Sequence, residues 1–164
     1  MKRYFWAIIM LIIASAIQGN LPGWMTVFGA KPDLVLIVLI IYALSADPDF
    51  GAVLGFIAGL IQGSVVGLSL GSFIVTRTIT GFLAGIVHTR LFSENPIVPM
   101  LSAVWLTLVC EGMFLLANPK PSFPNTIRTL LGECILNAIF AFLLYVFLRH
   151  LDTRRKIRLA NARL

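Results

Sequence analysis

The stretch GAVLGFIAGLIQGSVVGLSLG, from Gly51 to Gly71, has a glycine at every fourth position among residues that are almost all apolar. In a soluble helix, each interior glycine would cost roughly 1 kcal/mol relative to alanine. The pattern is typical instead of helices in lipid, where small residues let two backbones approach closely. The stretch therefore predicts a membrane helix whose packing face contains Gly51, Gly55, Gly59 and Gly63.

A second set of small residues follows in the next apolar run, where Arg77, Gly81 and Gly85 are spaced four residues apart. This spacing places the three residues on nearly one face of a helix. We expect the two glycine faces to pack against each other. Gly67 and Gly71 are expected to shape the turn between the two helices, because glycine readily adopts turn conformations.

The composition is that of a membrane protein. Hydrophobic residues make up 59% of the 164 residues and charged residues only 12%, far less charge than in a soluble domain. The apolar runs are continuous rather than alternating, which favours helices over the strands of a barrel. We therefore expect an all-α integral membrane protein.

Six apolar runs predict a bundle of six transmembrane helices, since about 20 helical residues cross a hydrocarbon core of about 30 Å. The second run is short, so the second and third spans either both cross the membrane or form a re-entrant hairpin. Residues 1–149 form the predicted transmembrane domain and residues 150–164 a basic cytoplasmic tail. The expected spans are approximately 4–20, 32–46, 50–66, 72–92, 97–117 and 127–149.

The basic residues predict the orientation, because cytoplasmic flanks carry the excess of lysine and arginine. Both termini are therefore expected in the cytoplasm, with an uncleaved first helix although its sequence imitates a signal peptide. The tail serves either as a plain topological anchor or as a contact for anionic lipid or a partner, and we expect no nucleic acid. One side of the membrane would carry Lys2, Arg3, Arg90, Arg149, Arg154, Arg155, Lys156, Arg158 and Arg163, and the other only Lys31 and Lys120.

The sequence offers no recognisable catalytic or metal-binding motif. Cys110 and Cys134 lie inside apolar spans without the spacing of a metal site, and His88 and His150 fall near the cytoplasmic ends. No nucleophile–base arrangement or phosphate-binding loop is present. We expect no catalytic residue, no cofactor and no metal.

Four ionisable residues, Arg77, Glu111, Arg128 and Glu133, are predicted at a similar depth near the outer membrane face. Charged groups at that depth are costly unless they are paired or face water. We expect a neutral quartet that points inward, together with two polar neighbours. The quartet is either an internal ion-pair clamp or the lining of an outward polar recess for a ligand or partner. The two neighbours are Gln62 and Asn137.

Three segments, Pro32–Leu36, Gly55–Ile61 and Gly67–Gly71, resemble the motif blocks of the MreD family of bacterial rod shape-determining membrane proteins. Many members of that family carry an acidic residue after the second glycine block, where this chain has Gln62.

The resemblance implies a non-enzymatic scaffold of the elongation (rod) complex in the bacterial inner membrane. It implies binding to MreC, further contact with MreB, RodA and a class B penicillin-binding protein, and a role in regulating peptidoglycan synthesis and cell shape. The family is also similar in fold to the S-components, the substrate-binding subunits of energy-coupling-factor transporters. A vitamin-binding subunit is therefore the main alternative, and an unrelated integral membrane protein is another.

Overall fold

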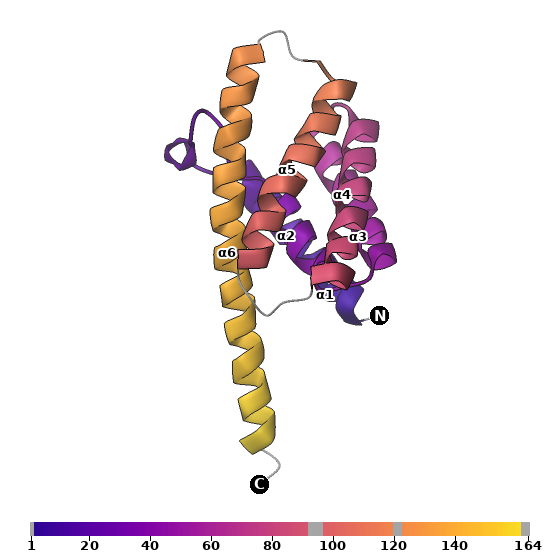
Figure 1. Ribbon diagram of the computed structural model, residues 1–164, viewed down its shortest axis with the longest axis vertical. Coiled ribbons are helices and arrows are strands. Elements are labelled where there is room, and N and C mark those ends of the chain that lie inside the picture. Colours follow the sequence, from indigo (N-terminus) through magenta and orange to yellow (C-terminus); the bar gives the residue numbers. More distant parts are fainter. Residues whose placement is uncertain (1, 92–96, 120–122, 162–164) are drawn as a thin grey trace.

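The computed structural model describes residues 2–91, 97–119 and 123–161, which form six α-helices and one short 3₁₀ helix, η1 (Figure 1). This confirms the all-α prediction, and one helix corresponds to each of the six expected spans. The helices are α1 (Lys2–Gly19), α2 (Leu34–Ala43), α3 (Pro48–Val66), α4 (Leu70–Leu91), α5 (Ile97–Ala117) and α6 (Phe123–Asn161), and η1 is Gly23–Met25.

Four of these helices are long and apolar enough to cross a membrane by themselves. They contain the segments Pro48–Val66, Leu70–Val87, Ile97–Ala117 and Pro124–Leu151, whereas α1 and α2 are shorter apolar helices. The 10 residues of α2 rise about 15 Å, which is about half of the hydrocarbon core.

Two helices differ in length from the expected spans. The predicted span 32–46 is helical only over Leu34–Ala43, because Asp33 caps its start and the chain turns before Pro48, the first residue of α3. Conversely, α6 exceeds the predicted span 127–149 at both ends. Its early Pro124 is tolerated in a first helical turn, and no later proline interrupts the helix.

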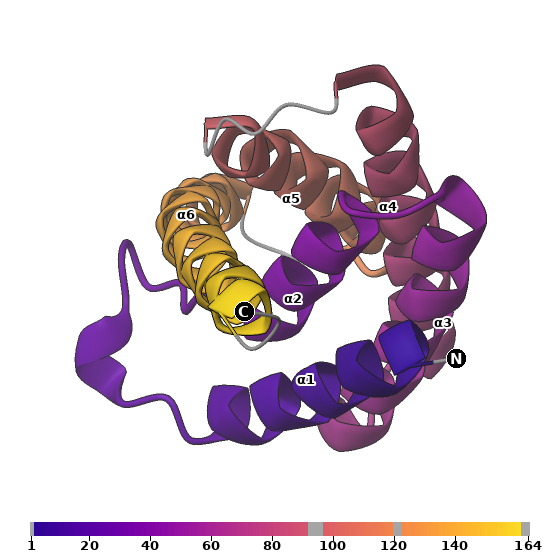
Figure 2. The same cartoon turned by 90° about the horizontal axis from the view of Figure 1, so that it is seen from below.

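The short helix α2 lies at the centre of the bundle. Seen along the long axis, the other five helices surround it, and α2 contacts each of them (Figure 2). Eight of its 10 residues are buried, as expected for a helix that is apolar on all sides. The start of α1 and the end of α6 lie toward the same end of the bundle (Figure 1).

Helices α3 and α4 are packed backbone to backbone. A Cβ atom added to Gly51 would overlap the carbonyl oxygen of Gly81, and one added to Gly55 would overlap that of Arg77. Only glycine permits this approach. Three more glycines are packed closely as well. A Cβ added to Gly59 would lie 2.5 Å from Ile74 Cα, one added to Gly63 would lie 2.6 Å from Leu70 Cδ1, and one added to Gly85 would lie 2.5 Å from Pro48 Cα.

The turn between α3 and α4 begins at Gly67, which ends α3 in the left-handed conformation with φ of 72°. Its N–H donates to the carbonyl oxygen of Gly63. Gly71 has open space where a Cβ would lie. The close helix contact therefore stops before the turn.

Candidate functional site

Asp33, at the N-terminus of α2, is the centre of a buried polar network. One carboxylate oxygen accepts a hydrogen bond of 2.9 Å from the N–H of Leu36 and so caps the helix. The other forms a salt bridge with the guanidinium of Arg77 on α4. Asp33 is 6% exposed and Arg77 1% exposed, so each charge depends on the other for compensation.

Gln62 of α3 bridges both members of this ion pair. Its Nε2 donates to Asp33 Oδ2 at 3.2 Å, and its Oε1 accepts from Arg77 Nε at 3.0 Å. An amide can donate and accept at the same time, whereas an ionised carboxylate only accepts. Gln62 therefore fits beside the acidic Asp33 in a way that a second carboxylate would not.

Asn137 connects the same point to α5 and α6. The backbone N–H of Asp33 donates to Asn137 Oδ1 at 2.8 Å, and Asn137 Nδ2 donates to Thr107 Oγ1 at 3.0 Å. Asn137 and Thr107 are completely buried. These bonds fix the start of α2 against the two helices on its other side.

Two further bonds extend the network to α5 and α1. Arg77 Nη1 donates to Cys110 Sγ on α5 at 2.7 Å, and the N–H of Val35 donates to Gln18 Oε1 on α1 at 3.1 Å. Asp33 thus bonds directly to α3, α4 and α6, and α5 joins through the partners Asn137 and Arg77. Helix α1 joins at Val35, two residues after Asp33. A fully satisfied network of this kind specifies one arrangement of the helices.

The four residues of the predicted quartet do not all meet. Arg77 pairs with Asp33, which lay outside the quartet. Arg128 is exposed, and its guanidinium carbon lies 5.8 Å from the ring centroid of Phe28. Glu111 and Glu133 do come together near the network, since carboxylate oxygens of Asp33, Glu111 and Glu133 lie within 4.8 Å of one another.

Asp33 was not among the predicted site residues, because it stands at the start of the predicted span 32–46, directly after Lys31 and Pro32. The structure brings it inside, because α2 is short and central and begins in the middle of the bundle. A signal was available: an acidic residue directly before the most apolar helix of the chain is a typical N-cap. An arginine predicted inside the membrane also required a partner.

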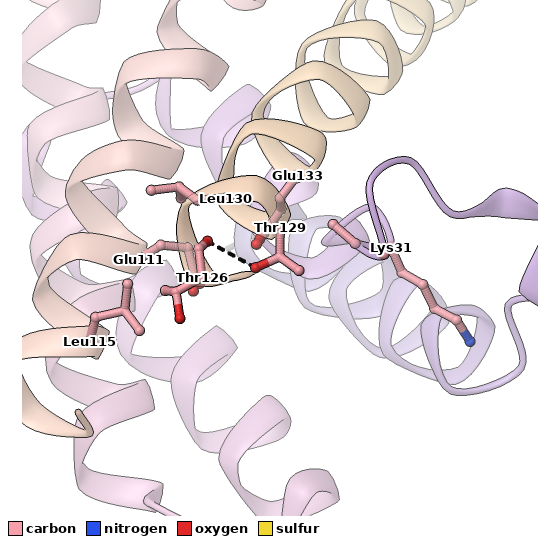
Figure 3. A pocket seen from close by; sticks show the side chains of 9 residues that line it. Lys31, Glu111, Leu115, Thr126, Thr129, Leu130 and Glu133 are labelled. Carbon is pink, nitrogen blue, oxygen red and sulfur yellow. Dashed lines mark hydrogen bonds between the residues drawn. The ribbon is translucent and has the colours of Figure 1, made fainter. Parts of the chain in front are cut away.

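Glu111 and Glu133 line a recess of about 210 Å³ beside the network (Figure 3). Lys31 is also at its edge, but its side chain points away from both glutamates in Figure 3, and its Nζ donates to the carbonyl oxygen of Leu21 at 2.8 Å. The recess therefore has an acidic wall next to the buried ion pair. Its lining consists of Gly29, Ala30, Lys31, Glu111, Leu115, Thr126, Thr129, Leu130 and Glu133.

The recess belongs to the half of the bundle opposite the start of α1 and the end of α6. Its residues come from the connection before α2, the last two turns of α5 and the first turns of α6. The orientation predicted from the sequence places this half of the bundle on the outer side of the membrane.

Comparison of the sequence with protein families identifies one group. The family model described as rod shape-determining protein MreD matches residues 1–153. The chain belongs to the MreD family. No curated protein and no solved structure matches it.

Family membership makes the chain a rod shape-determining membrane protein. It confirms the resemblance carried by the segments around Asp33, Gly59 and Gly67. Of these, the structure places Asp33 in the polar network and Gly59 in the α3–α4 contact.

Proposed function

We propose that the chain is a non-enzymatic scaffold of the rod complex in the bacterial inner membrane, where it binds MreC and helps to regulate peptidoglycan synthesis. The observation that carries the proposal is the buried polar network around Asp33, which fastens the start of α2 to α3, α4, α5 and α6 as one unit. A rigid unit presents preformed surfaces, so a partner does not have to order them when it binds.

The proposed docking site for MreC is the recess and the groove beside it. Asp33, Glu111 and Glu133 gather three acidic groups around one buried guanidinium, that of Arg77. Acidic groups that line a recess favour a basic side chain from the partner. We expect the transmembrane helix of MreC to lie against the bundle and its juxtamembrane segment to place such a side chain in the recess.

The proposed orientation puts both termini in the cytoplasm and the recess on the outer side. The nine-to-two distribution of flanking basic residues supports this orientation. The start of α1 and the end of α6 lie toward the same end of the bundle in Figure 1, as two termini on one side of the membrane require. In this orientation the start of α1 and the end of α6 are available to MreB, RodA or the class B penicillin-binding protein. We also propose that the chain resembles the S-component fold, which has six helices and a recess open to the outer side.

The test is capture of full-length MreC co-expressed with the full chain and purified through an affinity tag on either protein. Glu111→Gln and Glu133→Gln keep the side-chain shape and remove a charge. We expect each to lower the amount of MreC captured per folded molecule about tenfold, which corresponds to about 1.4 kcal/mol. Asp49→Asn is the matched control, because Asp49 is exposed in the first turn of α3, at the other end of the bundle.

The alternatives predict different results on the same variants. If Glu111 and Glu133 serve only as an internal clamp, the variants lose thermal stability while capture per folded molecule stays unchanged. If the recess instead belongs to a transport function, the purified chain alone retains a small molecule that mass spectrometry detects. Either outcome would remove the proposed docking role of the recess.

A further inference from the structure

The connection between α1 and α2 is a closed loop without charged residues between Leu21 and Ala30. Lys31 closes it by donating from Nζ to the carbonyl oxygen of Leu21. Near its end, Val27 and Ala30 exchange two backbone hydrogen bonds of 3.0 Å around a tight turn. Phe28 and Gly29 take positive φ angles of 53° and 83° in this turn.

The loop is fastened to α6. A Cβ on Gly132 would overlap the carbonyl oxygen of Val27, so the loop backbone lies directly on that helix. The guanidinium of Arg128, one turn earlier on α6, lies over the ring of Phe28. The loop is thus held in place by its own bonds and by α6, although it packs against few other elements.

The fixed loop presents two aromatic side chains to its surroundings. Trp24, in η1, is 81% exposed and Phe28 is 50% exposed. Burying such rings would remove a large apolar surface from water. A loop that kept them in water would more commonly carry charged residues, and the residues from 21 to 30 have none.

The loop projects sideways from the bundle rather than over its end. Both views show the segment containing η1 standing away from the helices beside α6 (Figures 1 and 2). The two helices next to it expose apolar side chains, among them Ile17 on α1 and Ile135 on α6. In a membrane protein these surfaces face lipid, so the loop extends into the same surroundings.

We propose that residues 21–30 form an interfacial lipid anchor, with Trp24 and Phe28 inserted among the lipids of the leaflet opposite the start of α1 and the end of α6. Tryptophan is enriched at membrane–water interfaces, because its ring is apolar while its indole N–H finds polar partners there. The same loop supplies Gly29, Ala30 and Lys31 to the recess. The anchor therefore holds one wall of the recess at a fixed depth, independently of whether MreC binds there.

The test measures where Trp24 lies. The chain has three tryptophans, so Trp6→Phe combined with Trp105→Phe leaves Trp24 as the single emitter in the full chain. The protein is reconstituted into vesicles of phosphatidylcholine brominated either near the headgroup end or near the tail end of its acyl chains. We expect bromine near the headgroup to reduce Trp24 emission at least twofold, and more than bromine near the tail end does. Iodide in the water should quench only weakly.

The matched control leaves Trp105 as the single emitter, since this residue lies on α5 and is 37% exposed. Efficient iodide quenching of Trp24 together with no quenching by either brominated lipid would show that the loop is in water and overturn the proposal. Loss of lipid quenching when full-length MreC is added would show that a protein covers this surface, and would overturn it as well. Proper folding of each variant is checked by size-exclusion chromatography.

Discussion

Asp33 on α2 and Arg77 on α4 form a salt bridge inside the bundle although 44 residues separate them in the chain. Helix α2 is apolar on all sides, so apolar packing alone does not favour one rotation of the helix about its own axis. The ion pair, Gln62 and Asn137 supply that preference at one end of the helix. Polar contacts therefore set the position of a helix that apolar contacts alone would leave undetermined.

We expect Asp33→Asn to destabilise the fold strongly. The change leaves the buried guanidinium of Arg77 without its carboxylate partner, and breaking a buried pair from one side typically costs about 3–5 kcal/mol. The apparent melting temperature in detergent, followed by fluorescence-detected size exclusion, should fall well below that of the exposed control Asp49→Asn. The double change Asp33→Asn with Arg77→Met should recover part of the loss. Equal melting temperatures for Asp33→Asn and the control would contradict this account.

The glycine contact could be predicted because its signal is local. Gly51, Gly55, Gly59 and Gly63 recur with a helical spacing, and that spacing alone places them on one face. Their partners on α4 have a similar spacing. The four-residue spacing along the chain is therefore enough to predict which residues form the contact between α3 and α4.

The polar network could be predicted only in part, because its pairs connect different helices. Gln62, Arg77 and Asn137 were identified as inward-facing from their depth in apolar runs. How deep Asp33 lies in the bundle depends on where α2 begins. Packing against the other helices determines that point, and the number of apolar residues in the run does not. Gly132 was missed for another reason: it has no glycine one turn away on α6, so nothing in its spacing indicates a close backbone contact.

We expect Gly55→Ala to disrupt the contact between α3 and α4. The added methyl would overlap the carbonyl oxygen of Arg77, and overpacking of this kind typically costs about 1–3 kcal/mol. Gly112→Ala is the matched control, because it adds the same methyl inside α5 where nothing lies within 4 Å. Alanine is the better helix former, so the control should be neutral or stabilising by up to about 1 kcal/mol. The two variants are compared by thermal unfolding in the same detergent. Equal stability of Gly55→Ala and Gly112→Ala would contradict the tight packing of α3 against α4.

The proposed orientation predicts the behaviour of reporter fusions. A reporter placed after Leu164 should be active in the cytoplasm, and one inserted in the 118–126 region should be active outside, because flanking lysine and arginine residues stay inside. A reporter at residues 44–47, between α2 and α3, should match the C-terminal one. A C-terminal fusion that is active only on the outer side would reverse the orientation and place the recess in the cytoplasm.

The last prediction concerns Gly132, where the 20–33 connection rests on α6. In Gly132→Ala, the new Cβ would overlap the carbonyl oxygen of Val27, so the turn from Val27 to Ala30 must move away from the helix. Hydrogen–deuterium exchange of the reconstituted protein should then increase severalfold in residues 20–33, since local opening controls exchange.

Exchange in α3 and α4 should stay as in the unchanged protein, because their contact does not involve Gly132. Gly112→Ala again provides the control with a methyl in open space. The displaced turn carries Gly29 and Ala30 with it, so Gly132→Ala should also weaken capture of MreC if the recess is the docking site. Unchanged exchange in residues 20–33 would mean that α6 does not hold the connection, and the wall of the recess would then need another support.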